Sequence, residues 1–116
     1  MAMTTADGAA APLLDRAYLS RFTLGNLDLE REVLGLFADQ APNYLQRMQT
    51  AASPQDWREA AHTLKGSAAA VGAVKVAKLA ESIERVAPPE AGAAREALCA
   101  DLAQAIAATR AAIAGC

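Results

Sequence analysis

The sequence predicts an all-α fold, an antiparallel up-down four-helix bundle with a short extra helix at its N-terminal end. Apolar residues make up 53% of the chain and aromatic residues only 4%. Much of the apolar content is alanine, which is the best helix former and lets helices approach closely. Apolar side chains also recur at helical spacing, with turn signals between the segments. Because the connections are short, successive long helices are expected to pack antiparallel.

The first expected helix spans about residues 12–23 and covers one end of the bundle. Asp15 is a plausible N-cap, and Tyr18, Leu19 and Phe22 would lie on one side of the helix. Gly25 and Asn26 break it. A long second helix is expected over about residues 27–50, with a core stripe of Val33, Phe37, Tyr44 and Met48 and, beside it, Leu34, Ala41 and Leu45.

The third helix has the clearest start in the chain. Ser53 is a preferred N-cap residue, Pro54 suits the first helical position, and Asp56 lies in the first turn. Spacings of four, three, four and three residues predict a core seam of Trp57, Ala61, Leu64, Ala68 and Val71. Gly72 fits a C-terminal stop.

Two further helices complete the expected bundle. The fourth spans about residues 73–86 and ends before Pro88 and Pro89. Its expected core residues are Val76, Leu79 or Ala80, Ile83 and Val86. The fifth spans about residues 90–114, with core residues Leu98, Leu102, Ile106, Thr109 and Ile113.

Length and composition exclude several classes of protein. A chain of 116 residues is one domain, expected over residues 13–116, and residues 1–12 are expected to be a disordered tail without signal-peptide features. The net charge of −2, with both signs interspersed, argues against nucleic-acid binding. No stretch approaches the roughly 20 apolar residues of a membrane span. Cys99 and Cys116 lack metal or redox spacing, which favours a reduced, cytoplasmic chain.

The only histidine, His62, is the strongest candidate for chemistry. The core seam passes through Ala61 and Leu64, so His62 lies about 100° around the helix from Ala61, on the flank or solvent face. Lys65 is displaced about 60° to one side, Gly66 about 40° to the other, and Ala69 only about 20°. A glycine inside a helix costs roughly 1 kcal/mol relative to alanine. Open space beside His62 would offset that cost, although close helix packing at Gly66 is an alternative.

These side chains suit phosphoryl transfer. Histidine offers a neutral nitrogen nucleophile near pH 7, and the Lys65 cation can stabilise the charge on the phosphoryl oxygens. Ser67 lies about 140° from His62, so its hydroxyl is expected to bond to the carbonyl of Thr63 in a structural role. The sequence has no phosphate-binding loop, no kinase glycine-rich turn and no metal-ligand spacing. The sequence therefore contains a group that can accept phosphate and a nearby cation, but not the groups that bind a nucleotide or a metal ion.

The run Ala61-His62-Thr63-Leu64-Lys65-Gly66-Ser67-Ala68-Ala69-Ala70-Val71-Gly72 resembles the signature of histidine phosphotransfer (HPt) domains. The similarity extends outward to Leu14-Asp15, to Phe37 and Pro42, and to Leu79 through Glu84, so it covers about residues 13–113. It implies that His62 carries phosphate and that the chain has no kinase or hydrolase site of its own. The implied partners are a hybrid sensor histidine kinase and response-regulator receiver domains. A receiver would supply the aspartate, Mg²⁺ and most catalytic groups, so the chain itself needs no cofactor.

A receiver must cover His62 to exchange phosphate. The expected docking surface comprises residues on the His62 flank and one polar side chain from the next helix: Arg58, Glu59, Gly66, Ala69 and Glu84. Spacing alone does not show which way Glu84 points. Two alternatives remain open, a helical adaptor that has the fold without phosphate exchange and a dimerising bundle whose histidine is incidental.

Overall fold

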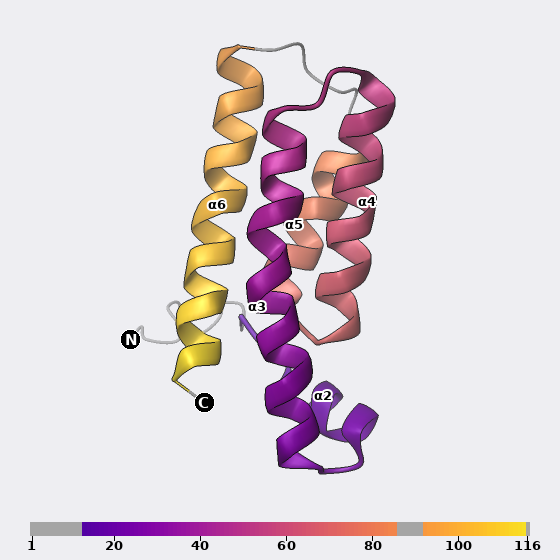
Figure 1. The fold of residues 1–116 in the computed structure, drawn as a ribbon, viewed down its shortest axis with the longest axis vertical. Coiled ribbons are helices and arrows are strands. Elements are labelled where there is room, and N and C mark those ends of the chain that lie inside the picture. Colours follow the sequence, from indigo (N-terminus) through magenta and orange to yellow (C-terminus); the bar gives the residue numbers. More distant parts are fainter. Residues whose placement is uncertain (1–12, 86–91, 116) are drawn as a thin grey trace, which may run out of the picture.

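A computed structural model describes residues 13–85 and 92–115 of the chain, and these residues form five α-helices and no strand (Figure 1). The helices are α2 (Arg16–Thr23), α3 (Leu27–Gln49), α4 (Pro54–Ala70), α5 (Val74–Arg85) and α6 (Ala93–Ala114). The predicted all-α class is confirmed. The expected N-terminal tail, Val86, the two prolines after it and Cys116 lie outside the described residues.

Side chains cap the helix starts that the sequence predicted. The carboxylate of Asp15 accepts the N–H of Tyr18 at 2.9 Å, and the hydroxyl of Ser53 accepts the N–H of Asp56 at 3.1 Å. Each contact satisfies a backbone donor that has no partner within the helix. Asn26, which the sequence marked only as a break, is the N-cap of α3.

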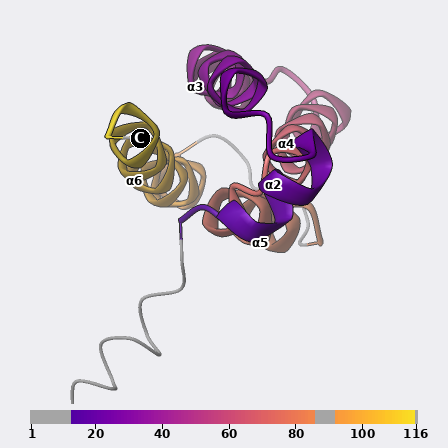
Figure 2. The same ribbon diagram turned by 90° about the horizontal axis from the view of Figure 1, so that it is seen from below.

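The core lies among the four long helices. Helix α4 packs on α3 and α5, and α6 packs on α3 and α5, so the four helices surround one apolar interior (Figures 1 and 2). The predicted seam of α4 is confirmed, because all five of its residues are buried, with Trp57 and Leu64 completely enclosed. Full burial of side chains of this size stabilises the fold by about 1.5–3 kcal/mol each. Burial of this seam therefore fixes the rotation of α4 about its axis, so the side of the helix opposite the seam faces solvent.

Helix α2 lies across the end of the bundle where α4 turns into α5 (Figure 2). Two backbone hydrogen bonds join the segment before α2 to that turn: Asp15 N–H to the Gly72 carbonyl at 2.7 Å, and Val74 N–H to the Leu13 carbonyl at 3.1 Å. Gly72 has φ +75°, and a Cβ there would lie 2.9 Å from the Asp15 carbonyl oxygen. Glycine is required at this position both by the backbone angle and by the close approach.

The first helix differs in detail from the expectation. Leu19 is its buried anchor, whereas Phe22 is 61% exposed and Tyr18 is 36% exposed. A buried polar pair that the sequence pattern does not predict joins α2 to α3, with the Thr23 hydroxyl donating to the Glu30 carboxylate at 3.0 Å. Thr23 and Glu30 are each only 4% exposed. A short helix has room for few buried positions, so the polar pair contributes part of the contact that the apolar stripe was expected to make.

Helix α6 differs from the expectation that no segment is long and apolar enough to span a membrane. By length and composition alone it could cross a membrane, and it is the one helix among the described residues that could. Its alanine content accounts for this, because alanine is apolar but leaves little side chain to bury. In the bundle, α6 packs on α3 and α5 and buries Cys99, Leu102, Ala105, Ile106 and Thr109. One face of α6 is therefore buried in the bundle.

Candidate functional site

His62 lies near the middle of α4 on its solvent-facing flank. Its side chain is 66% exposed, whereas the neighbouring seam residues Ala61 and Leu64 are completely buried. The helix is held in this rotation by its buried seam, with Trp57 at one end and Val71 at the other. The exposed position of the ring agrees with the angle that the spacing predicted.

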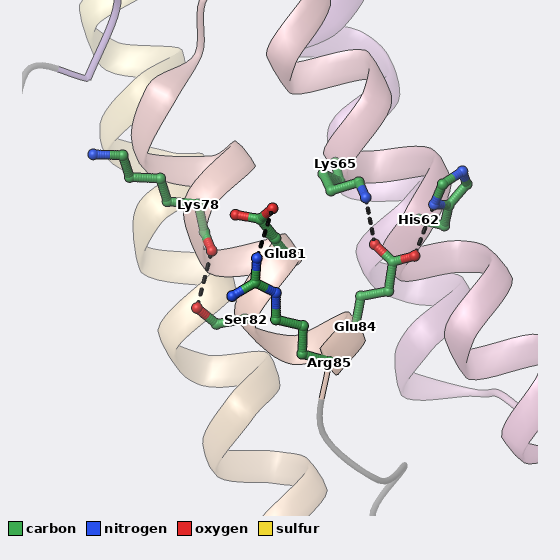
Figure 3. Close-up of polar contacts among 7 residues, drawn as sticks. All are labelled: His62, Lys65, Lys78, Glu81, Ser82, Glu84 and Arg85. Carbon is green, nitrogen blue, oxygen red and sulfur yellow. Dashed lines mark hydrogen bonds and ion pairs between the residues drawn. The ribbon is translucent and has the colours of Figure 1, made fainter.

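Glu84 of α5 brings the second helix into the site. Its Oε2 lies 2.8 Å from Nδ1 of His62, and its Oε1 lies 2.8 Å from Nζ of Lys65 (Figure 3). The Glu84 side chain is 25% exposed, and the Lys65 side chain is 30% exposed. One carboxylate therefore contacts both functional side chains of α4. The sequence places Glu84 only in the expected docking surface, and spacing does not show which way it points.

The two contacts set the charge of Glu84. The Lys65 ammonium, and after it the His62 imidazole, hold the pKa of the Glu84 carboxyl below its ordinary value, against a smaller opposing effect of desolvation. Glu84 is thus a carboxylate at neutral pH. The short contact to Lys65 is an ion pair, and the contact to His62 is a hydrogen bond whose donor is the Nδ1–H.

This hydrogen bond determines which ring nitrogen is available. A carboxylate accepts but does not donate, so a neutral His62 that bonds to Glu84 carries its proton on Nδ1. Its lone pair is then on Nε2. Figure 3 shows Nε2 on the side of the ring away from Glu84, and no described residue forms a hydrogen bond with it. The arrangement presents a nucleophilic nitrogen to solvent.

The surface beside His62 is open. A Cβ built on Gly66 would meet nothing within 4 Å, so this glycine does not serve close helix packing. Ala69, one turn further along α4, is also exposed. On the other side, an open depression of about 410 Å³ is lined by Arg58, Glu59, His62, Thr63 and Glu84. All five residues expected at the docking surface therefore lie on the face that carries the imidazole or at its edge.

Other candidate residues have structural positions. The bond expected from the Ser67 hydroxyl to the Thr63 carbonyl is not formed, and Ser67 is half-buried. Gly72 ends α4 in a left-handed conformation and joins α2 to the bundle. Cys99 is buried in α6, where desolvation raises the pKa of its thiol. Within residues 13–85 and 92–115, no group of three His, Cys, Asp or Glu side chains is arranged to hold a metal ion.

Comparison with known proteins agrees with the geometry of the site. The family model described as Hpt domain matches residues 32–113, which include His62, Lys65 and Glu84. No curated protein and no solved structure matches the chain. The family match covers more than half of the 116 residues and the whole of the site. The chain therefore belongs to the Hpt domain family.

Proposed function

We propose that this protein is a histidine phosphotransfer protein, which accepts a phosphoryl group on Nε2 of His62 and exchanges it with the aspartate of a response-regulator receiver domain. The observation that carries the proposal is the pairing of an exposed imidazole with Glu84. In the neutral ring, that contact holds the proton on Nδ1 and leaves the lone pair on the outward nitrogen. Membership of the Hpt domain family supports the same conclusion.

The bonds that form and break in the transfer step involve only the imidazole and a phosphoaspartate. The Nε2 lone pair forms the bond to phosphorus as the bond from phosphorus to the aspartate oxygen breaks, and that electron pair leaves on the aspartate carboxylate. Nδ1 keeps its proton, so the phosphorylated ring carries a positive charge that faces the Glu84 carboxylate. In the reverse direction the electron pair of the N–P bond returns to Nε2.

The partner is expected to complete the site. Phosphoryl transfer spreads negative charge over three equatorial oxygens, and the Lys65 ammonium adds one nearby cation. A receiver domain would supply the aspartate and Mg²⁺, and a hybrid sensor kinase would supply the phosphate. We place the docking surface over Gly66 and Ala69, with Arg58 and Glu59 at its rim, because small exposed side chains leave the approach to the imidazole free.

The proposal also includes the arrangement of the helices and the location of the protein in the cell. We infer that α3 to α6 form an antiparallel up-down bundle, since short connections join helices that contact each other. A cytoplasmic location fits exchange with receivers. The alternative is a helical adaptor or dimerising bundle that has the fold without phosphate exchange.

The test is incubation of the purified protein with a receiver domain phosphorylated by a labelled small-molecule donor. We expect label on the protein that is lost in acid and stable in alkali, as a phosphohistidine is. The variant His62→Gln should remain folded and unlabelled, because an exposed ring contributes little to stability. Absence of label on the wild type across the receivers of its own genome would favour the adaptor.

A further inference from the structure

The carboxylate of Glu84 is shared between two groups of α4. Its Oε2 lies 2.8 Å from Nδ1 of His62, and its Oε1 lies 2.8 Å from Nζ of Lys65. The Lys65 ammonium therefore faces the carboxylate, and the carboxylate faces the imidazole (Figure 3). A change in the charge on the imidazole therefore changes its electrostatic interaction with the Glu84 carboxylate. Lys65 weakens this interaction because it partly neutralises the carboxylate.

We propose that Glu84, with Lys65 as its counter-charge, sets how long His62 holds a phosphoryl group. This inference rests on the proposed function, because it concerns the phosphorylated state of His62. It assigns Glu84 as a positioning residue that acts through the imidazole and does not touch phosphorus. Lys65 opposes the effect of Glu84 in the isolated protein.

The chemistry of phosphate loss gives the mechanism. Water attacks phosphorus, the N–P bond breaks, and its electron pair returns to Nε2. This is easiest when Nδ1 is protonated, because the group that leaves is then a neutral imidazole. The water oxygen becomes part of inorganic phosphate, and its proton goes to solvent. A carboxylate beside Nδ1–H favours the protonated ring, and so it favours loss of phosphate.

The two members of the ion pair therefore have opposite effects. Glu84→Gln removes the negative charge that favours the protonated ring, so phosphate should be lost more slowly. Lys65→Met keeps the aliphatic stem but removes the cation, so the full charge of Glu84 acts on the ring and phosphate should be lost faster. A purely structural role for either residue predicts no such opposition.

The other charged side chains near the Glu84–Lys65 ion pair either lie beside a side chain of opposite charge or contact another group. On α4, Arg58 and Glu59 line the same depression with opposite charge. On α5, Glu81 pairs with Arg85 at 3.4 Å. From α3, Arg47 lies over the ring of Tyr44.

The remaining neighbour, α6, directs its Arg95 guanidinium at the ring of Trp57. Among the described residues, the charged group bonded to the imidazole is thus Glu84, which is itself paired with Lys65.

The experiment uses phosphoramidate as a phosphoryl donor, so that no partner protein is needed. The chain has one histidine, and a phosphohistidine signal therefore belongs to His62. After removal of the donor, the rate of phosphate loss is measured between pH 6 and pH 9 for the wild type, Glu84→Gln and Lys65→Met. Matched controls are Glu81→Gln and Lys78→Met, which remove the same charges from exposed positions on α5 without contact to His62.

At pH 8 we expect Glu84→Gln to lose phosphate about two- to fivefold more slowly than the wild type, and Lys65→Met to lose it faster by a similar factor, the range that an exposed ion pair produces. The pH at which loss slows should move down in Glu84→Gln and up in Lys65→Met. Both controls should match the wild type.

Equal rates in all five proteins, or changes of the same sign in Glu84→Gln and Lys65→Met, would overturn the inference. Either result would leave the proposed function intact, because exchange with a receiver is measured separately. Conversely, a protein that phosphoramidate labels but no receiver does would contradict the proposed function and leave the lifetime result standing.

Discussion

Replacing Gly66 by glutamine separates the stability of α4 from access to His62. The glycine is inside the helix, its backbone is in the ordinary helical region, and a Cβ would meet nothing within 4 Å. Because Gly66 is exposed and a Cβ there would clash with nothing in the described part of the chain, a glutamine side chain can extend into solvent. It does extend into the open surface beside the imidazole, which a receiver must reach.

The size of the stability change follows from helix propensity. Glycine costs about 1 kcal/mol relative to alanine in a helix interior, and glutamine lies slightly below alanine on the same scale. We therefore expect Gly66→Gln to raise the free energy of unfolding by about 0.5–1 kcal/mol. For a domain of this size the corresponding rise in Tm is about 2–6 °C. A circular dichroism melt measures it.

The transfer rate should change in the opposite direction. A displacement of reacting atoms by about 1 Å costs on the order of 100-fold in rate, so an obstructing side chain should slow transfer from a phosphorylated receiver about tenfold or more. Gly35→Gln in α3 is the matched control, because a Cβ there also meets nothing within 4 Å. It should gain similar stability and transfer at the wild-type rate. Normal transfer by Gly66→Gln would refute the docking route, and a loss of stability would refute the packing argument.

Three further predictions concern the bundle and the charges at the site. Gly72→Ala should lower the free energy of unfolding by about 1–3 kcal/mol, because the left-handed backbone angle and the Asp15 carbonyl both oppose a Cβ. Urea denaturation measures this change, and unchanged stability would contradict the prediction. Lys65→Met should slow transfer from a receiver without abolishing it, because the cation assists but forms no bond; an equal rate at low ionic strength would make Lys65 a solvated charge only. The pKa of Glu84 is lowered from 4.5 on folding, so its contribution to stability is present above pH 4.5 and lost as the pH falls through the lower folded value. The difference in stability between the wild type and Glu84→Gln should therefore shrink in acid, and a difference that grows below pH 4 would contradict the assignment.

Local signals in the sequence predicted the helices well. Ser53 and Asp15 cap the helices that they were expected to start, and Gly72 ends α4. These features depend on backbone groups within a few residues, so spacing alone determines them. The buried seam of α4 was predicted for the same reason, and it fixed the exposed side on which His62 lies.

Contacts between helices were much less predictable. Glu84 follows His62 by 22 residues, and its contact depends on the rotation and register of α5 against α4, which periodicity does not give. The Thr23–Glu30 pair was missed because a glutamate in a helix usually faces water, and only the packing of α2 on α3 buries this one. Helical periodicity therefore located the imidazole, and tertiary packing supplied the group that orients it.

The identity of the phosphorylated nitrogen tests the account most directly. The protein is phosphorylated by a receiver domain, and NMR of the phosphoprotein then assigns the N–P bond to one ring nitrogen of the single histidine. The contact between Nδ1 and Glu84 predicts phosphate on Nε2 of His62, with no label in His62→Gln. Phosphate on Nδ1, or on any residue other than His62, would contradict the account.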